Sequence, residues 1–223
     1  MNGIPTWTPA EIEAKSFAII EQELQEAGIC LDPDKAPVIK RAIHTSADFD
    51  YAKTLTFSDG VVDLAKQLLR EGCDIVTDTN MALTGINKGR LAQRGGSVYC
   101  WMAEADVASE AKKRGVTRAS VSMERAAAFV RKSGRPTIFA IGNAPTALIT
   151  LRDLWEEEVF RPDLVIGVPV GFVHVVEAKE GILGTTIPSI INRGRKGGSN
   201  IAAAIVNALL YEAAREEKGD ALV

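Results

Sequence analysis

Apolar residues recur at every third or fourth position in several long stretches of the chain, which is the spacing of one buried helix face. The predicted helices cover residues 8–28, 32–45, 59–72, 143–159 and 199–217. The first of them starts at a capping candidate, Thr8, has Pro9 in its first turn and ends at Gly28. These start and stop signals support a helix there independently of the apolar spacing.

Between the predicted helices, apolar residues follow one another without a break. The runs are CDIVTDT (73–79), SVYCW (97–101), PTIFAIG (136–142) and DLVIGVPVG (163–171). Continuous apolar runs separated by helices are typical of strands buried on both faces of a parallel sheet. By the same criterion PSIINR (188–193) is a poor candidate for a buried strand. The alternation predicts the α/β class, with a doubly wound, mainly parallel sheet in a three-layer α/β/α arrangement.

Composition limits the class of protein. The chain has 223 residues, of which 46% are apolar and 25% charged, so it is long enough for one domain over 1–223 and does not require two. A net charge of −3 argues against a general nucleic-acid binder, and no stretch is apolar enough to span a membrane. Three cysteines without a CxxC pair favour reduced thiols over disulfides. We therefore expect a cytoplasmic protein without nucleic-acid or membrane partners.

The predicted strand ends are the first place to look for a site, because ligands of open parallel sheets bind outside the carboxyl ends of the strands. The run at 73–79 ends in Thr-Asp-Thr, where Asp78 can orient polar groups of a substrate. The run at 136–142 is followed by Asn143, which can donate and accept hydrogen bonds. From the residues alone, a simple helix cap is the favoured role for Asn143.

The segment GRKGGSN (194–200) combines glycines and cations directly before a predicted helix. Its glycines are Gly194, Gly197 and Gly198, and its cations with the preceding residue are Arg193, Arg195 and Lys196. Such a segment can bind a carboxylate or a phosphate through backbone N–H groups and positive charge. A flexible basic loop with Ser199 as a helix cap explains it equally well. Its spacing is not that of a P-loop.

The segment RAIHTSADFD (41–50) contains one of only two histidines in the chain. If the predicted helix continues to His44, this side chain projects opposite the apolar stripe, with Arg41 one turn before it on the same side. Asp48 lies close by in sequence, although a turn can begin before it. A histidine near an arginine and an acid is suited to proton transfer, and a solvated helix face is the plainer explanation. The other histidine, His174, is predicted to be a surface or structural residue on an amphipathic helix.

Motifs for other chemistries are missing from the chain. It contains no HExxH or other close set of metal ligands, no GxSxG and no GxGxxG. A protein-bound catalytic metal, a serine hydrolase and a dinucleotide enzyme are therefore all disfavoured.

Several segments together resemble one family, the precorrin-8X methylmutases of cobalamin biosynthesis. They are KSFAIIEQEL, VIKRAIHTSADFDYA, IVTDTNMALTGI, TRAS, IGNAPTAL, VIGVPVGFVHVVEAKE and GRKGGSNIAAAIVNAL, and they span about residues 10–211. The resemblance implies a flavodoxin-like fold, a homodimer and no redox cofactor. It also implies that a methyl group migrates from C11 to C12 within a corrin ring. The reaction would turn precorrin-8X into hydrogenobyrinic acid, or cobalt-precorrin-8 into cobyrinic acid.

The resemblance also implies roles for particular residues. His44, in the family's RxIH motif, becomes the proton donor or acceptor, while Arg41, Ser16, Thr117 and Arg118 become substrate contacts. With the strand ends and the glycine-rich segment, the expected substrate contacts are Ser16, Arg41, Thr45, Asp78, Thr117, Arg118, Asn143, Arg193, Gly194, Arg195, Lys196, Gly197, Gly198 and Ser199. At position 174 the family more often has a small residue.

Two other functions stay open at this point. A corrinoid carrier without catalysis would use the same pocket and would not need His44. A phosphate- or nucleotide-binding α/β enzyme would use GRKGGSN as its phosphate loop.

Overall fold

The computed structural model describes residues 6–217 and is built on one six-stranded sheet. The strands are β1 (Leu55–Phe57), β2 (Asp74–Thr77), β3 (Val98–Tyr99), β4 (Thr137–Ile141), β5 (Leu164–Gly167) and β6 (Ser189–Asn192). Their order is β1-β6-β5-β4-β2-β3, and only β1 is antiparallel to its neighbour. Counted among themselves, the parallel strands have the order 2-1-3-4-5, which is that of flavodoxin-like folds. The predicted α/β fold with a doubly wound, mainly parallel sheet is confirmed.

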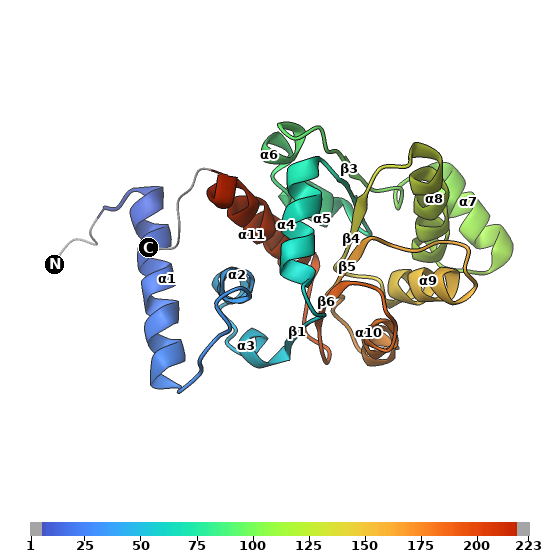
Figure 1. Ribbon diagram of the computed structural model, residues 1–223. Helices are drawn as coiled ribbons and strands as arrows, with labels where there is room; N and C mark the ends of the chain where they lie inside the picture. The colour runs from blue at the N-terminus through green and yellow to red at the C-terminus, as the bar shows by residue number, and fades with distance from the viewer. Residues whose placement is uncertain (1–5, 218–223) are drawn as a thin grey trace.

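Helices cover both faces of this sheet, so the molecule has three layers (Figure 1). The helices are α1 (Pro9–Glu26), α2 (Ala36–Ser46), α3 (Tyr51–Thr54), α4 (Val61–Glu71), α5 (Asn80–Gly85), α6 (Lys88–Ala92), α7 (Ala105–Arg114), α8 (Arg118–Ser133), α9 (Pro145–Glu156), α10 (Val175–Leu183) and α11 (Ser199–Glu217). One buried cluster joins the sheet to α2, α4 and α11, and a second joins it to α8, α9 and α10. None of the helices formed by residues 6–217 is long and apolar enough to cross a membrane.

Two predictions about the positions of strands and helices are wrong. Residues 189–192 form the strand β6, and all four are buried. Polar residues at its ends hid it, but both have partners: the Ser189 N–H donates to the Ser58 hydroxyl, and the Asn192 amide oxygen accepts from the Thr54 hydroxyl. His174 lies before α10 rather than on it, with a left-handed backbone (φ 55°) and an exposed side chain.

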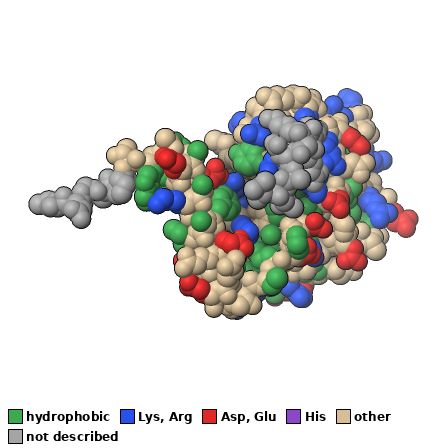
Figure 2. All heavy atoms as spheres, turned by 60° about the vertical axis from the view of Figure 1, so that its left-hand side comes forward, with side chains coloured by type: hydrophobic (Ala, Val, Ile, Leu, Met, Phe, Trp, Pro, Cys, Tyr) green, Lys and Arg blue, Asp and Glu red, His purple; other side chains and the backbone are tan. Residues whose placement is uncertain are grey.

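Helix α1 contacts the body of the molecule much less than the other long helices do. Thr8 caps it as predicted, through a reciprocal pair of hydrogen bonds with Glu11. Only Ile20 and Leu24 of this helix are buried, and Figure 1 shows the helix standing to one side of the sheet. A cavity of about 1050 Å³ lies between α1, α2 and the end of α11. Figure 2 looks onto this side, where apolar and charged side chains surround a hollow.

Candidate functional site

His44 lies in the last turn of α2, on the side facing away from the core. The helix buries Val38, Ile39, Ala42 and Ile43 and ends where Ala47 turns into the left-handed region (φ 54°). His44 is exposed, as the helical projection predicted, and it makes no hydrogen bond to any other described residue. Its ring stacks on Phe17 of α1, with centroids 5.2 Å apart and planes only 8° from parallel. The imidazole nitrogens thus remain available to a ligand while the ring is held by its face.

Arg41 lies on the same side of α2 and shares this aromatic contact. Its guanidinium carbon is 4.7 Å from the centroid of Phe17, and one of its nitrogens is 2.6 Å from the carboxylate of Glu13. Ser16, beside Phe17, is partly buried and donates its hydroxyl hydrogen to the carbonyl of Ile12 at 2.8 Å. Helix α1 therefore brings Ser16 and Phe17 to the side of α2 where Arg41 and His44 lie.

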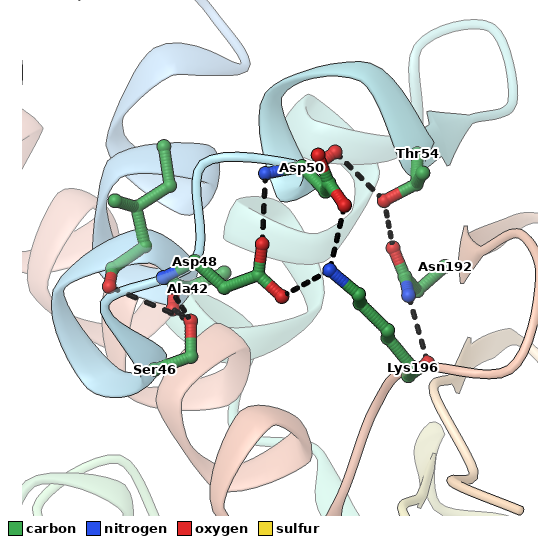
Figure 3. A network of polar contacts seen from close by, with 8 residues as sticks. Ala42, Ser46, Asp48, Asp50, Thr54, Asn192 and Lys196 are labelled. Carbon is green, nitrogen blue, oxygen red and sulfur yellow. Dashed lines mark hydrogen bonds and ion pairs between the residues drawn. The ribbon is translucent and has the colours of Figure 1, made fainter. Parts of the chain in front are cut away.

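Lys196 connects the chain after His44 to the glycine-rich segment 193–198. Its ammonium group lies 2.6 Å from a carboxylate oxygen of both Asp48 and Asp50, as Figure 3 shows. The Asn192 side-chain amide donates to the Lys196 carbonyl at 2.8 Å, and the Thr54 hydroxyl donates to Asn192 in turn. The hydrogen bond from Lys196 holds the pKa of Asp48 below its usual value. Two segments that are about 150 residues apart in sequence thus form one polar network.

The segment 193–198 is held in place rather than flexible, which contradicts that alternative from the sequence. Gly197 has φ 157°, and a Cβ there would lie 2.0 Å from the carbonyl oxygen of Val168, so only glycine fits. The Gly198 N–H donates to the same Val168 carbonyl at 2.9 Å. The segment therefore packs directly against the chain that follows β5.

The cations of this segment differ in their pairing. Arg193 forms an ion pair with Glu180, and Lys196 is shared between Asp48 and Asp50. Arg195 is exposed over the ring of Phe172, 5.5 Å from its centroid, and no acidic side chain within residues 6–217 pairs with it. Of the three cations, Arg195 is therefore the best placed to bind a carboxylate group of a ligand.

Asp78 joins the ends of β2 and β4, where the strand order reverses. Its side chain is fully buried and accepts hydrogen bonds from the N–H groups of Gly142, Asn143 and Ala144 at 2.9, 2.8 and 2.6 Å. Burial raises the pKa of Asp78, and these donors act in the opposite direction. Asp78 thus holds three peptide groups in place, and its expected contact with the substrate stays a prediction.

Asn143 is exposed, and it is not the helix cap that the residues alone favoured. The N-cap position of α9 belongs to Ala144, and the Asn143 side chain makes no capping bond. Its backbone N–H donates to Asp78, and its side chain is exposed at the edge of the sheet. This geometry agrees with the other prediction for Asn143, a polar contact to a ligand.

The neighbouring strand ends bring further predicted residues to the same edge. The hydroxyl groups of Thr79 and Ser199 lie 2.8 Å apart, which connects the end of β2 to the start of α11. Ser199 is the first residue of α11 rather than a cap before it. Thr117 caps α8 and its hydroxyl lies 2.8 Å from that of Thr146 in α9, while Arg118 is exposed.

Most of the predicted residues therefore lie on one continuous path along the sheet edge, from Thr117 through Asp78 and Ser199 to Lys196 and the end of α2. Phe17, Asp50 and Lys179 belong to the same network but were not predicted. Phe17 could have been found from the sequence as the aromatic residue next to Ser16, and Asp50 as a second acid close to Asp48. Lys179 gave no such signal, because nothing in VVEAKE distinguishes a buried lysine from a solvated one. Among residues 6–217 no group of three or more histidine, cysteine, aspartate or glutamate side chains is arranged to hold a metal ion.

Comparison with known proteins identifies the family. The family model described as CbiC, precorrin-8X methylmutase, matches residues 11–212. The chain belongs to the precorrin-8X methylmutase family. The family's members catalyse an isomerisation in cobalamin biosynthesis, and this chain is accordingly an isomerase of the methylmutase type. Membership favours the enzyme over both alternatives left open by the sequence, the carrier and the nucleotide-binding enzyme.

Relatives and a solved structure agree along nearly the whole chain. A cobalt-precorrin-8 methylmutase of Salmonella typhimurium is 43% identical and covers 91% of this chain and 95% of its own. A precorrin-8X methylmutase of Pseudomonas aeruginosa is 38% identical, and the match covers 90% of this chain and 94% of the relative. The crystal structure of precorrin-8X methylmutase from Thermus thermophilus superposes with a TM-score of 0.82 at 35% identity. The match covers 96% of this chain and 99% of that one. The predicted family and fold are thus confirmed.

Proposed function

We propose that this methylmutase moves a methyl group from C11 to C12 of precorrin-8X, or of cobalt-precorrin-8, with His44 as the group that transfers a proton. The products are hydrogenobyrinic acid and cobyrinic acid, respectively. The observation that carries the proposal is the exposed imidazole of His44, which is held by its face on Phe17 and has no hydrogen-bond partner among the described residues. A histidine in this state can give a proton to a bound molecule and take it back.

The proposed role of His44 fits the chemistry of the reaction. Substrate and product are isomers, so the reaction needs no oxidant or reductant and the proton is returned at the end. Protonation of a ring nitrogen or of the tautomerising edge redistributes the double bonds of the macrocycle and lowers the barrier to the methyl shift. His44 then removes that proton. Arg41, held over Phe17 on the same side, supplies a positive charge that favours bound carboxylates near His44.

The sheet edge has the surface that a large, flat, carboxylate-edged ring requires. Phe172 and Val173 after β5, and Met81 after β2, are strongly exposed apolar residues there, at 81%, 73% and 68% exposure. Arg195 and Arg118 are exposed cations without an acidic partner in the described part of the chain. Apolar contacts for the ring with cations at its rim are a common combination in ligand sites.

The test is anaerobic incubation of the purified protein with precorrin-8X and, separately, with cobalt-precorrin-8, followed by visible absorption. Conversion of one substrate to the chromophore of its product supports the proposal and identifies the branch of the pathway. Binding of both without conversion contradicts it and favours a carrier. A thermal shift with ATP or NADP, without any corrinoid effect, would favour the nucleotide-binding enzyme.

We also propose a homodimer in which a second copy covers α1. This helix exposes Ile12 and Ile19 at 50% and 55%, together with Trp7 just before it. Exposed apolar side chains along one helix support an interface. Sedimentation should show a dimer for the wild type and a monomer for the double variant Ile12→Glu and Ile19→Glu. A wild-type monomer would contradict the proposal.

A cytoplasmic location is part of the proposal. Cys30, Cys73 and Cys100 are all free thiols, which supports a reducing compartment. Fractionation of the producing cells tests it, and recovery in a membrane or secreted fraction would contradict it.

A further inference from the structure

Lys179 of α10 is a fully buried lysine without a carboxylate partner among the described residues. Its ammonium nitrogen donates to two carbonyl oxygens, those of Gly194 and Lys196, each at 2.8 Å. Burial lowers the pKa of Lys179 to about 8. Lysine is almost never fully buried unless it is paired, because removing its charge from water is costly. A buried lysine whose two hydrogen bonds both go to one loop is therefore unusual.

Those two hydrogen bonds determine the orientation of peptide groups in the segment 193–198. The peptide bonds of the described residues are all trans, so a carbonyl and the following N–H point in opposite directions. With the carbonyls of Gly194 and Lys196 turned toward Lys179, the N–H groups of Arg195 and Gly197 face away from it. Neither of these N–H groups donates to another residue in the described part of the chain. A cation on the carbonyl side also polarises each peptide group and makes its N–H a stronger donor.

The same contacts connect Lys179 to the end of α2. The Lys196 carbonyl that Lys179 binds is also bound by Asn192, and the Lys196 side chain reaches Asp48 and Asp50. Figure 3 shows the part of this chain of contacts that runs from Asp48 and Asp50 through Lys196 to Asn192. Two further backbone hydrogen bonds, from Gly198 to Val168 and from Gly171 to Arg195, join the loop to the chain after β5. Lys179 differs from Asn192 in binding the carbonyls of both Gly194 and Lys196, so it spans the middle of the loop.

We propose that Lys179 is a positioning residue of the methylmutase site: it holds the loop 193–198 in the shape that presents Arg195 and the loop's N–H groups to the substrate and keeps Lys196 against the end of α2. This rests on the proposed function, in which the loop and His44 share one substrate. Lys179 itself touches no substrate, because it is completely buried.

The test compares Lys179→Met with the wild type in steady-state kinetics, with Lys66→Met as the control. Lys66 is a second, nearly buried lysine, on α4 and paired with Asp63, outside the site. For Lys179→Met we expect KM to rise at least tenfold, kcat to fall less than KM rises, and the Kd of the corrinoid product to rise in parallel. Lys66→Met should leave KM within twofold of the wild type. Lys179→Gln keeps a hydrogen-bond donor, so its KM and Kd should lie between those of the wild type and those of Lys179→Met. If Lys179→Met does not fold, Lys179→Gln takes its place in the comparison.

A purely structural role gives a different result. Loss of folded protein lowers apparent kcat and leaves KM and Kd unchanged, and that outcome overturns the proposal. Its failure is distinguishable from failure of the proposed function. If the wild type converts neither substrate, the proposed function fails. Amide hydrogen exchange then tests separately whether Lys179 holds the loop 193–198. Faster exchange confined to 193–198 in Lys179→Met supports the positioning role, and unchanged exchange there overturns it.

Discussion

The two sides of the candidate site are built very differently. At the sheet edge, Asp78 binds three backbone N–H groups, and Lys179 binds two carbonyls from beneath the loop 193–198. On the α1 side, only two side chains of that helix are buried, and residues of α1, α2 and α11 line a cavity of about 1050 Å³. The edge is therefore rigid before any ligand binds, whereas the α1 side has room for a further molecule. His44 lies where the two meet, on α2 but stacked against α1.

The largest effect on stability should come from the rigid side. Asp78→Asn leaves one amide oxygen for three N–H donors and turns an NH₂ group toward them, so we expect a loss of about 3 kcal/mol in the free energy of unfolding. Urea denaturation measures it. Asp63→Asn, an exposed acid on α4, is the control and should change stability by less than about 1 kcal/mol. Equal losses in the two variants would show that Asp78 does not organise this edge.

A smaller loss of stability with a clear loss of activity is expected at the junction. Phe17→Leu removes the ring on which His44 and Arg41 lie. We expect kcat to fall about tenfold because the imidazole loses its fixed orientation, and stability to fall by about 1 kcal/mol. Phe17→Tyr keeps the ring and should retain most of the activity. If Phe17→Leu turns over as fast as the wild type, the stacking has no role in positioning His44.

On the loosely packed side, removing an ion pair should matter least to stability. Lys40 pairs with Glu21 of α1 at the protein surface. Glu21→Gln should therefore lower the free energy of unfolding by no more than about 0.5 kcal/mol in urea denaturation. A loss comparable to that of Asp78→Asn would mean that α1 is held much more tightly than its contacts indicate.

The smallest effect concerns pH and the link between α2 and the loop. The pKa of Asp48 is lowered by its hydrogen bond from Lys196, so the folded protein holds this carboxylate ionised more strongly than the unfolded chain does. The resulting stabilisation is complete above the unfolded value, 3.8, and is lost as pH falls through the lower folded value. Asp48→Asn should flatten the pH dependence of the melting temperature only below about pH 4. A change confined to neutral pH would contradict this assignment.

Sequence periodicity was sufficient for the parts of the fold that carry strong, regular patterns. The strands at β2, β4 and β5 and the helix at 199–217 appear where their apolar runs placed them. β6 was missed because its buried Ser189 and Asn192 look polar until their partners are known. α8 was also absent from the prediction, since alanine and serine make up much of its buried face and give a weak periodic signal.

The site was predictable to the extent that its residues carry recognisable chemistry. His44, Arg41 and the segment 193–199 were found as separate features, but their connection through Lys196 depends on contacts far apart in sequence. For Asp78 the strand-end position was predicted, but its complete burial and its three backbone partners were not. Lys179 could not be predicted, because burial of a lysine is decided by the packing of α10 and not by its neighbours in the chain.

The most direct test of the account is to measure turnover and corrinoid binding together for His44→Ala, using the substrate that the wild type converts. We expect turnover to be abolished and the Kd for the corrinoid to stay close to that of the wild type. His174→Asn, which changes the other histidine and tolerates its left-handed backbone, should keep full turnover. If His44→Ala turns over normally, His44 does not transfer the proton and the central claim is wrong.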